Sequence, residues 1–306
     1  MPGAFAHLPE TVRTPGKGHL HMDTASTPNE AVPITAEFVW SARDEVRRTT
    51  PLVHSITNYV AMDLSANVLL AAGASPAMVH AVEEAGEFAG IASSLVVNIG
   101  TLSPPWVDAM HAAATVAGER GIPWVLDPVA VGATGYRSRV ADDLLNARPT
   151  IVRGNASEIL ALATTAGVAT SASHRPSQGR GVDSTDTADT AVDAAMALAR
   201  HTGGTVAVTG QTDVVTDGTR LARVAGGDSL ITTITAVGCS VSALTAAFAT
   251  VGDDRFETTA AALAVMSVAV ERAAAGATGP GSLRLRLLDE LYALDEPTVL
   301  RGVRVS

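Results

Sequence analysis

The chain has 306 residues, of which 47% are hydrophobic and 17% charged, and its formal net charge is −10. A chain of this length can bury a sizeable core, and the acidic surplus argues against a nucleic-acid binder, which would present a basic face. Cys239 is the only cysteine, so an intramolecular disulfide is excluded and the sequence gives no sign of an oxidising compartment.

Residues 1–34 read as a flexible tail, because they carry Pro, Gly, Thr and His without an apolar period. Residues 35–306 read as one domain, since no Pro/Ser-rich linker divides them. The Ser/Thr-rich stretch 170–190 is either a surface loop or a flexible loop over a site. The first residues lack a basic segment followed by an apolar stretch, so we expect no signal peptide, and Gly, Thr and charges interrupt the apolar runs. We therefore expect a cytoplasmic protein that does not enter a membrane.

Short apolar runs alternate with segments of helical period along the domain. Helices are expected at 35–48, 58–72, 82–90, 105–120, 157–165, 191–201, 238–251 and 258–275. Strands are expected at 52–56, 76–79, 94–99, 124–126, 151–152, 205–208 and 231–235, with a hairpin beginning at 214–215. This alternation predicts an α/β fold with a mainly parallel central sheet and helices on both faces. Ligands of such sheets bind beyond the carboxyl ends of the strands.

The segment TAVGCSVSALTAAF, residues 235–248, places a turn of small residues before a helix. The first turn of a helix leaves N–H groups unpaired, and small residues let a phosphate approach them. Cys239 lies at this helix start, where the helix end should depress the pKa of the thiol and fit it to take a proton from a substrate hydroxyl. An ordinary tight turn with a buried cysteine is the alternative.

Two further motifs follow predicted strands. In RGNASEI, Arg153 can pair with phosphate oxygens, and Glu158 shares a helix face with Asn155, an arrangement that suits Mg2+ held through water. A helix cap formed by Asn155 or Ser157 is the alternative. In DPVAVGATGYR, Asp127 ends a strand, where it could make a second contact to Mg2+. The alternative is that this aspartate only stabilises the turn before Pro128.

The remaining candidates are also strand ends. Thr209 ends the strand VAVT, where its hydroxyl could bind a nucleotide phosphate, and the motif NIGTL, residues 98–102, ends a third strand. On the acceptor side, Asn58 offers a polar group. Met78 offers a soft apolar surface that suits a flat, sulfur-containing ring, with core packing as its alternative role.

Taken in order, SITNYVAMDLSANVLLAAGASPAM, NIGTL, VLDPVAVGATGYR, IVRGNASEI, VTGQTDVV and GPGS resemble the hydroxyethylthiazole kinase family. The resemblance runs from about residue 35 to about residue 294. It implies a ribokinase-like fold, transfer of the γ-phosphate of ATP to the hydroxyl of 4-methyl-5-(2-hydroxyethyl)thiazole in thiamine salvage, a need for Mg2+, and a homotrimer with sites between subunits.

The resemblance also implies roles for single residues. The substrate-binding residues are Met78, Asn58 and Ala236; the ATP-binding residues are Arg153, Thr209 and Gly238; the metal-binding residues are Asp127 and Glu158; and the catalytic residue is Cys239. Cys239 stands where ribokinase relatives place a catalytic aspartate. This fits the thiazole branch and speaks against sugar or pyrimidine kinases.

The chain departs from the family pattern T-G-x-G-C at one position, because Ala236 replaces its first glycine. A glycine tolerates positive φ and a close backbone approach, whereas Ala236 adds a Cβ and Val237 adds stiffness. We expect the fold to survive and the anion site to be tighter, with slow turnover. The other readings are a kinase of another small alcohol, an ATP-dependent dehydratase of damaged nicotinamide cofactor, and a thiazole-binding protein with little or no turnover.

Overall fold

The computed structural model describes residues 34–168 and 188–306. The predicted tail, apart from Ile34, and nearly all of the predicted loop at 170–190 lie outside the described residues. Ile34 is buried in the core, and the hydroxyl of Thr35 caps the first helix by accepting the N–H of Phe38. Ile34, the last residue of the predicted tail, is therefore packed with the domain.

The helices of the described part are α1 (Ala36–Thr49), α2 (Met62–Ala72), α3 (Val82–Ala89), α4 (Pro104–Arg120), α5 (Gly135–Asn146), α6 (Ala156–Thr165), α7 (Val192–Thr202), α8 (Val237–Phe248), α9 (Arg255–Ala275), α10 (Pro280–Ala293) and α11 (Glu296–Gly302), with 3-10 turns η1 (Ala188–Ala191) and η2 (Ser229–Thr233). The strands are β1 (Leu52–Ile56), β2 (Ser75–Ala77), β3 (Ser94–Asn98), β4 (Trp124–Asp127), β5 (Ile151–Asn155), β6 (Thr205–Thr209), β7 (Thr212–Thr216) and β8 (Leu221–Ala225).

These strands form one sheet in the order β2-β1-β3-β4-β5-β6-β7-β8. The pairs from β2 to β6 are parallel, whereas β7 and β8 complete an antiparallel edge. The prediction of a mainly parallel sheet is confirmed. Each parallel connection passes through at least one helix, so the carboxyl ends of the six parallel strands, β1 to β6, meet at one edge.

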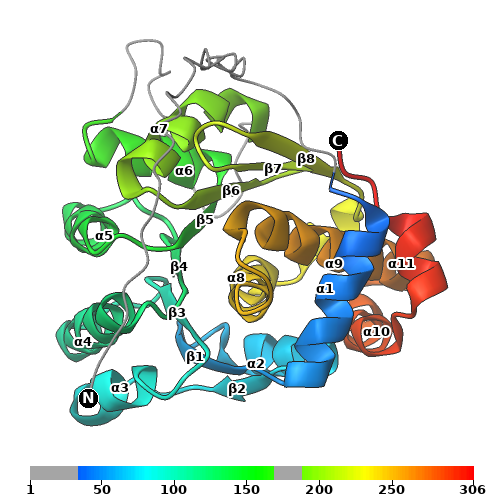
Figure 1. Cartoon of the computed structure of the whole chain (residues 1–306), viewed down its shortest axis with the longest axis horizontal. Coiled ribbons are helices and arrows are strands. Elements are labelled where there is room, and N and C mark those ends of the chain that lie inside the picture. Colours follow the sequence, from blue (N-terminus) through cyan, green and yellow to red (C-terminus); the bar gives the residue numbers. More distant parts are fainter. Residues whose placement is uncertain (1–33, 169–187) are drawn as a thin grey trace, which may run out of the picture.

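Helices cover both faces of the sheet, as Figure 1 shows, with α3 to α7 on one side and α1, α2, α8 and α9 on the other. The strands supply both cores because their side chains alternate between faces. In β3, Leu95 and Val97 join the core under α3 to α7, while Val96 joins the core under α8 and α9. All five residues of β3 are buried, as expected of a strand covered on both faces.

The helix α9 is the one in the described ranges that is long and apolar enough to cross a membrane by length and composition. Burial explains the composition, because 78% of its most apolar window lies inside the fold. It packs on α8, α10 and α1 as a core helix.

One predicted strand is wrong. Residues 231–235 do not join the sheet, and most of them lie in η2. The Asp228 side chain accepts the N–H of Leu230, and the hydroxyls of Thr232 and Thr233 bond to carbonyls three residues back. Such local bonds compete with strand pairing. The sequence analysis also left α5, α10, α11 and β8 unassigned.

Candidate active site

Polar residues gather at the carboxyl edge of the sheet. The register pairs Asn98, the last residue of β3, with Asp127, the last residue of β4. It also pairs Asn155 at the end of β5 with Thr209 at the end of β6. The helix α8 reaches the same place, because Ser242 donates a hydrogen bond to Asp127 Oδ2 over 2.8 Å. The predicted convergence of strand ends is confirmed.

The turn before α8 adopts a backbone conformation that favours glycine. Ala236, the N-cap residue, has φ 66° and ψ 4°, in the left-handed region that costs a non-glycine residue about 1–2 kcal/mol. Within the described ranges no side chain caps α8, so the N–H groups of its first turn face outward with a partial positive charge. This geometry agrees with the expectation that a glycine is the easier residue at position 236.

Gly238, in the first turn of α8, lies against the guanidinium of Arg153. A Cβ added to Gly238 would lie 2.8 Å from Nη1 of Arg153, a distance that side chains do not tolerate. Arg153 is buried, and its Nη2 donates to the hydroxyl of Thr209. Its Nε finds no acceptor among the described residues. A buried cation short of acceptors, beside free helix N–H groups, is suited to an anionic ligand such as phosphate.

Asp127 is fully buried at the end of β4. Its Oδ2 accepts hydrogen bonds from Asn98 Nδ2 at 2.7 Å and from Ser242 Oγ at 2.8 Å. Its Oδ1 lies 4.0 Å from Arg153 Nη1 and has no hydrogen-bond partner in the described chain. Burial raises the pKa of this carboxyl, and the Arg153 charge and the two hydrogen bonds oppose the rise.

Glu158 closes a capping box at the start of α6. Asn155 accepts the Glu158 N–H, and Glu158 Oε2 accepts the Asn155 N–H at 2.8 Å. Its Oε1 accepts the N–H of Ala130 at 2.9 Å, from the loop after β4. The cap considered from the sequence is thus present. Burial, and then the negative charge of Asp127, raise the pKa of Glu158, which shows that the two carboxylates repel each other.

This carboxylate pair fits a hydrated divalent cation. The described residues contain no group of three or more His, Cys, Asp or Glu side chains able to enclose a metal. Mg2+ does not need such a cage, since it usually keeps several waters and binds one or two carboxylates plus substrate phosphates. The unpartnered Oδ1 of Asp127 is the direct ligand position that the structure offers, with Glu158 beside it.

On the other side of Asp127, two asparagines connect the strand ends to the thiol. Asn58 follows β1 and is buried. Its Nδ2 donates to Asn98 Oδ1 at 2.8 Å and to Cys239 Sγ at 3.3 Å, while its Oδ1 accepts the Ala61 N–H. A Cβ on Gly100 would meet the Asn58 side chain at 2.6 Å. The predicted polar group on the acceptor side therefore contacts the predicted catalytic residue.

The expected low pKa of Cys239 is wrong. Burial first, and then the negative charge of Asp127, raise the pKa of this thiol to about 11. The hydrogen bond from Asn58 and the charge of Arg153 act in the opposite direction without overcoming them. The helix end is visible in the sequence, whereas the carboxylate of Asp127 lies 112 positions away in the chain and comes close only in the fold. At neutral pH the site holds a thiol rather than a thiolate.

Met78 is half-buried and lies just after β2, the strand beside β1. It therefore occupies the same edge of the sheet as Asn58. The Nε2–H of His54, on β1, donates a hydrogen bond to the carbonyl of Val79 over 2.8 Å and so ties this segment to the sheet. The placement agrees with an apolar wall on the acceptor side.

Three polar residues of the site were not assigned a role from the sequence. Asn98 and Ser242 bond directly to Asp127. Asp213, at the start of β7, accepts the N–H of Gly210 at 2.9 Å, and burial raises the pKa of its carboxyl to about 6 against the opposing charge of Arg153. Asn98 could have been found as the polar end of the strand in NIGTL, and Ser242 as a helix neighbour of Cys239 at spacing three.

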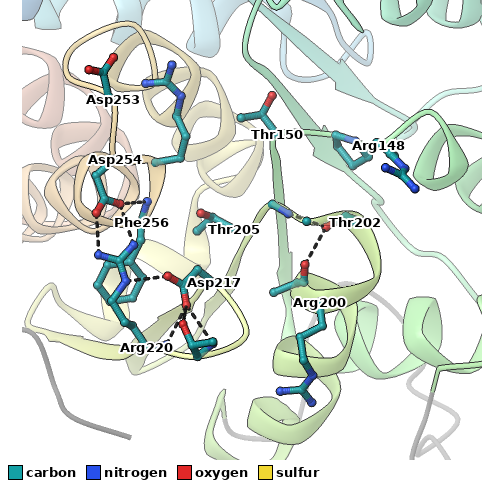
Figure 2. A pocket seen from close by; sticks show the side chains of 16 residues that line it. Arg148, Thr150, Arg200, Thr202, Thr205, Asp217, Arg220, Asp253, Asp254 and Phe256 are labelled. Carbon is teal, nitrogen blue, oxygen red and sulfur yellow. Dashed lines mark hydrogen bonds and ion pairs between the residues drawn. The ribbon is translucent and has the colours of Figure 1, made fainter. Parts of the chain in front are cut away.

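A cavity of 820 Å³ lies away from these residues, at the amino edge of the sheet, where Thr150 precedes β5 and Thr205 begins β6. Figure 2 shows that Arg148 and Arg200 do not converge on one point in it. Arg220 is already paired with Asp217 and Asp254. The residues that line this cavity therefore do not offer unpaired polar groups that point toward one another. The carboxyl edge of the sheet does, and it is the candidate active site.

Comparison with known proteins shows which family the chain belongs to. The model of the "HK: Hydroxyethylthiazole kinase family" matches residues 44–297. A hydroxyethylthiazole kinase of Rhizobium etli is 56% identical over 264 residues, covering 86% of this chain and 98% of that protein. One of Cereibacter sphaeroides is 53% identical over 263 residues, covering 86% and 96%.

Solved structures give the same result. The hydroxyethylthiazole kinase protein of Pyrococcus horikoshii superposes with a TM-score of 0.79 at 39% identity, covering 88% of this chain and 98% of that chain. A pyridoxal kinase of Staphylococcus aureus in complex with AMP-PCP superposes with a TM-score of 0.54 at 16% identity, covering 72% and 88%, and shares the fold alone. On the extent of these matches, the chain belongs to the hydroxyethylthiazole kinase family, with a ribokinase-like fold.

Proposed function

We propose that this enzyme transfers the γ-phosphoryl group of ATP to the hydroxyl of 4-methyl-5-(2-hydroxyethyl)thiazole, as a kinase of thiamine salvage. One observation carries the proposal for the site: the buried guanidinium of Arg153 packs against Gly238 at the free end of α8, next to the thiol of Cys239. An anion site and an acceptor site are thus adjacent, as phosphoryl transfer requires.

The phosphates of ATP are assigned to Arg153, Gly238 and Thr209. Arg153 supplies charge-assisted donors, and the first turn of α8 supplies N–H groups aimed at the transferred group. The Thr209 hydroxyl, which accepts from Arg153, holds the guanidinium in place. These groups are fixed before the ligand arrives, so little reorganisation is needed as negative charge develops.

Asp127 and Glu158 are assigned to Mg2+. When bound, this ion neutralises phosphate charge and orients the triphosphate. Asp127 contributes Oδ1, which is buried and has no hydrogen-bond partner in residues 34–168 and 188–306. The oxygens of Glu158 are engaged by backbone N–H groups, so we assign it contact through water. Each carboxyl has a raised pKa, and a nearby cation would favour the charged form of both.

The thiazole is assigned to the space next to Asn58, Met78, Ala236 and Cys239, with the hydroxyethyl arm at the thiol. A neutral thiol is a weak base, so Cys239 serves mainly to position the alcohol. A loose transition state places little demand on a base, and positioning and electrostatics account for most of the rate.

A homotrimer with sites between subunits, and a cytoplasmic location, belong to the same proposal and rest on the family resemblance. Two exposed apolar residues support an interface near the site. Tyr59 and Val60 directly follow Asn58 and are 69% and 57% exposed. Large apolar groups side by side on a surface are typical of contact regions.

The proposal is tested by incubating the purified chain with ATP, Mg2+ and the thiazole alcohol. We expect ADP release that depends on the alcohol, and a product whose mass has increased by one phosphoryl group. ADP release only with a different small alcohol would establish the alternative kinase. Saturable thiazole binding without ADP release would establish a binding protein.

A further inference from the structure

Two side chains from elements that are distant in sequence, β3 and α8, donate hydrogen bonds to one carboxylate oxygen at the end of β4. Asn98 from β3 and Ser242 from α8 both donate to Oδ2 of Asp127, which ends β4. All three side chains are fully buried. The two donors therefore hold the carboxylate from one side and leave Oδ1 to face the site.

The state of Oδ1 requires an explanation. A buried carboxylate oxygen without a hydrogen bond is rare in folded proteins and costs free energy. Oδ1 has no partner in the described chain, and the nearest cationic atom, Arg153 Nη1, is 4.0 Å away. Without the hydrogen bonds from Ser242 and Asn98 the carboxylate could rotate. Its Oδ1 could then accept a hydrogen bond inside the protein and would no longer be available to a ligand.

Ser242 behaves differently from its neighbours on α8. The hydroxyls of Ser240 and Thr245 donate to carbonyls of their own helix, Ala236 and Val241, both at 2.9 Å. Ser242 instead donates across to Asp127 at 2.8 Å, while the carbonyl of Gly238, four residues back, is 3.5 Å away. The shorter hydrogen bond of this buried hydroxyl is therefore the one to the carboxylate, and not the one to the backbone of its own helix.

We propose that Ser242 is a positioning residue for phosphoryl transfer: together with Asn98 it fixes the carboxylate of Asp127 so that Oδ1 is presented to the divalent cation that accompanies the nucleotide. The proposal rests on the proposed function in one respect, the assignment of Asp127 to Mg2+. It differs from the roles of Cys239 and Arg153, because Ser242 acts through Asp127. Groups that orient metal ligands in this way commonly alter metal affinity about 10–100-fold when removed.

The test measures binding of Mn2+ to the protein in the presence of ADP. Binding is monitored as the decrease of the electron paramagnetic resonance signal of free Mn2+. Neither thiazole nor turnover is needed. We expect Ser242→Ala to weaken Mn2+ binding about tenfold and to lower kcat, with the KM for thiazole unchanged. Ser242→Thr, which keeps the hydroxyl, should restore Mn2+ affinity to within about threefold of wild type.

Thr245→Val is the matched control, because it removes a buried hydroxyl of the same helix that bonds only to its own backbone. It should leave Mn2+ affinity unchanged. Wild-type Mn2+ affinity in folded Ser242→Ala, or an equal loss in Ser242→Ala and Thr245→Val, would overturn the proposal. If Ser242→Ala does not fold, near-isosteric Ser242→Cys replaces it, and its weaker donor should still reduce affinity several-fold; unchanged affinity there also overturns the proposal.

The same measurement separates this proposal from the proposed function. A wild-type chain that binds Mn2+ with ADP but does not phosphorylate the thiazole would refute the substrate assignment and leave the role of Ser242 open to the variants above. A chain that phosphorylates the thiazole while Ser242→Ala binds Mn2+ normally would refute the role of Ser242 alone.

Discussion

At the scale of single residues, Ala236 is where the chain departs most clearly from its family, and its backbone conformation explains the consequence. Its φ of 66° is one that a glycine adopts freely and an alanine adopts at a cost of about 1–2 kcal/mol. The turn therefore carries strain beside the anion site. The strain is local, since α8 beyond it is regular and buried.

We predict that Ala236→Gly stabilises the protein by about 0.5–1 kcal/mol, because relief of strain outweighs the entropy that glycine adds to the unfolded chain. If the Cβ crowds the transferred phosphoryl group, kcat should rise as well. Denaturant unfolding and steady-state kinetics measure the two effects. A more stable variant with unchanged or lower kcat would show that the Cβ does not limit turnover.

The thiol of Cys239 gives a second prediction at this scale. Its pKa is raised to about 11, so the thiolate forms only at high pH. Because Cys239 is the only cysteine, alkylation by neutral iodoacetamide reports on it alone. The alkylation rate should still be rising between pH 9 and pH 10, since the thiolate is the nucleophile. A plateau below pH 9 would restore the low pKa expected from the helix end.

The same raised pKa predicts a small catalytic role. Cys239→Ala should lower kcat no more than about tenfold, because a neutral thiol contributes positioning rather than strong base catalysis. Steady-state kinetics with saturating ATP provides the measurement. A thousand-fold loss with thiazole affinity intact would show that the thiol takes part in proton transfer.

At the scale of elements, the cap at the start of α6 both stabilises this helix and holds residues of the candidate active site in place. The Asn155 cap ends β5 two residues after Arg153, and the Glu158 carboxylate ties the cap to the loop after β4. We predict that Asn155→Ala costs about 1 kcal/mol and also lowers kcat/KM for ATP, because both proposed phosphate and metal ligands depend on this turn.

Thr35→Ala is the control for that prediction. Thr35 caps α1 through the N–H of Phe38, and α1 packs mainly on α9 and α11; none of the residues proposed to bind phosphate or metal lies on α1. It should cost a similar free energy of unfolding and leave the kinetics unchanged. Equal kinetic losses in the two variants would mean that general destabilisation, and not the turn at Asn155, lowers activity.

The elements also show where sequence reasoning succeeds and fails. Strands such as β3 were predicted because an uninterrupted apolar run is typical of a buried parallel strand. Residues 231–235 are β-branched throughout, which also favours a strand, yet their hydroxyls and the Asp228 cap close a 3-10 turn instead. In α10, Leu285 and Tyr292 are apolar but exposed. Apolar residues therefore occur on both faces of this helix, and its sequence does not show the clear helical period from which the other helices are predicted.

At the scale of the whole molecule, the sheet order assembles the site. Asn58, Asn98, Asp127, Arg153 and Thr209 come from five successive parallel strands, β1, β3, β4, β5 and β6, or the turns after them. The sequence could predict that strand ends converge, because parallel strands end at one edge. It could not predict that Asn98 and Ser242 would meet on one oxygen of Asp127, because that contact depends on strand register and on the rotation of α8.

The last prediction concerns assembly. If the active form is a homotrimer, its mass in solution should be three times the 31.2 kDa of one chain, as light scattering after gel filtration can measure. We predict that Val60→Asp dissociates it and lowers activity, because a charge would be buried in an apolar contact beside Asn58. Ile91→Asp is the control, since Ile91 is 67% exposed but precedes β3, at the opposite edge of the sheet. A monomeric wild type with full activity would contradict shared sites, and a trimeric, active Val60→Asp would place the interface elsewhere.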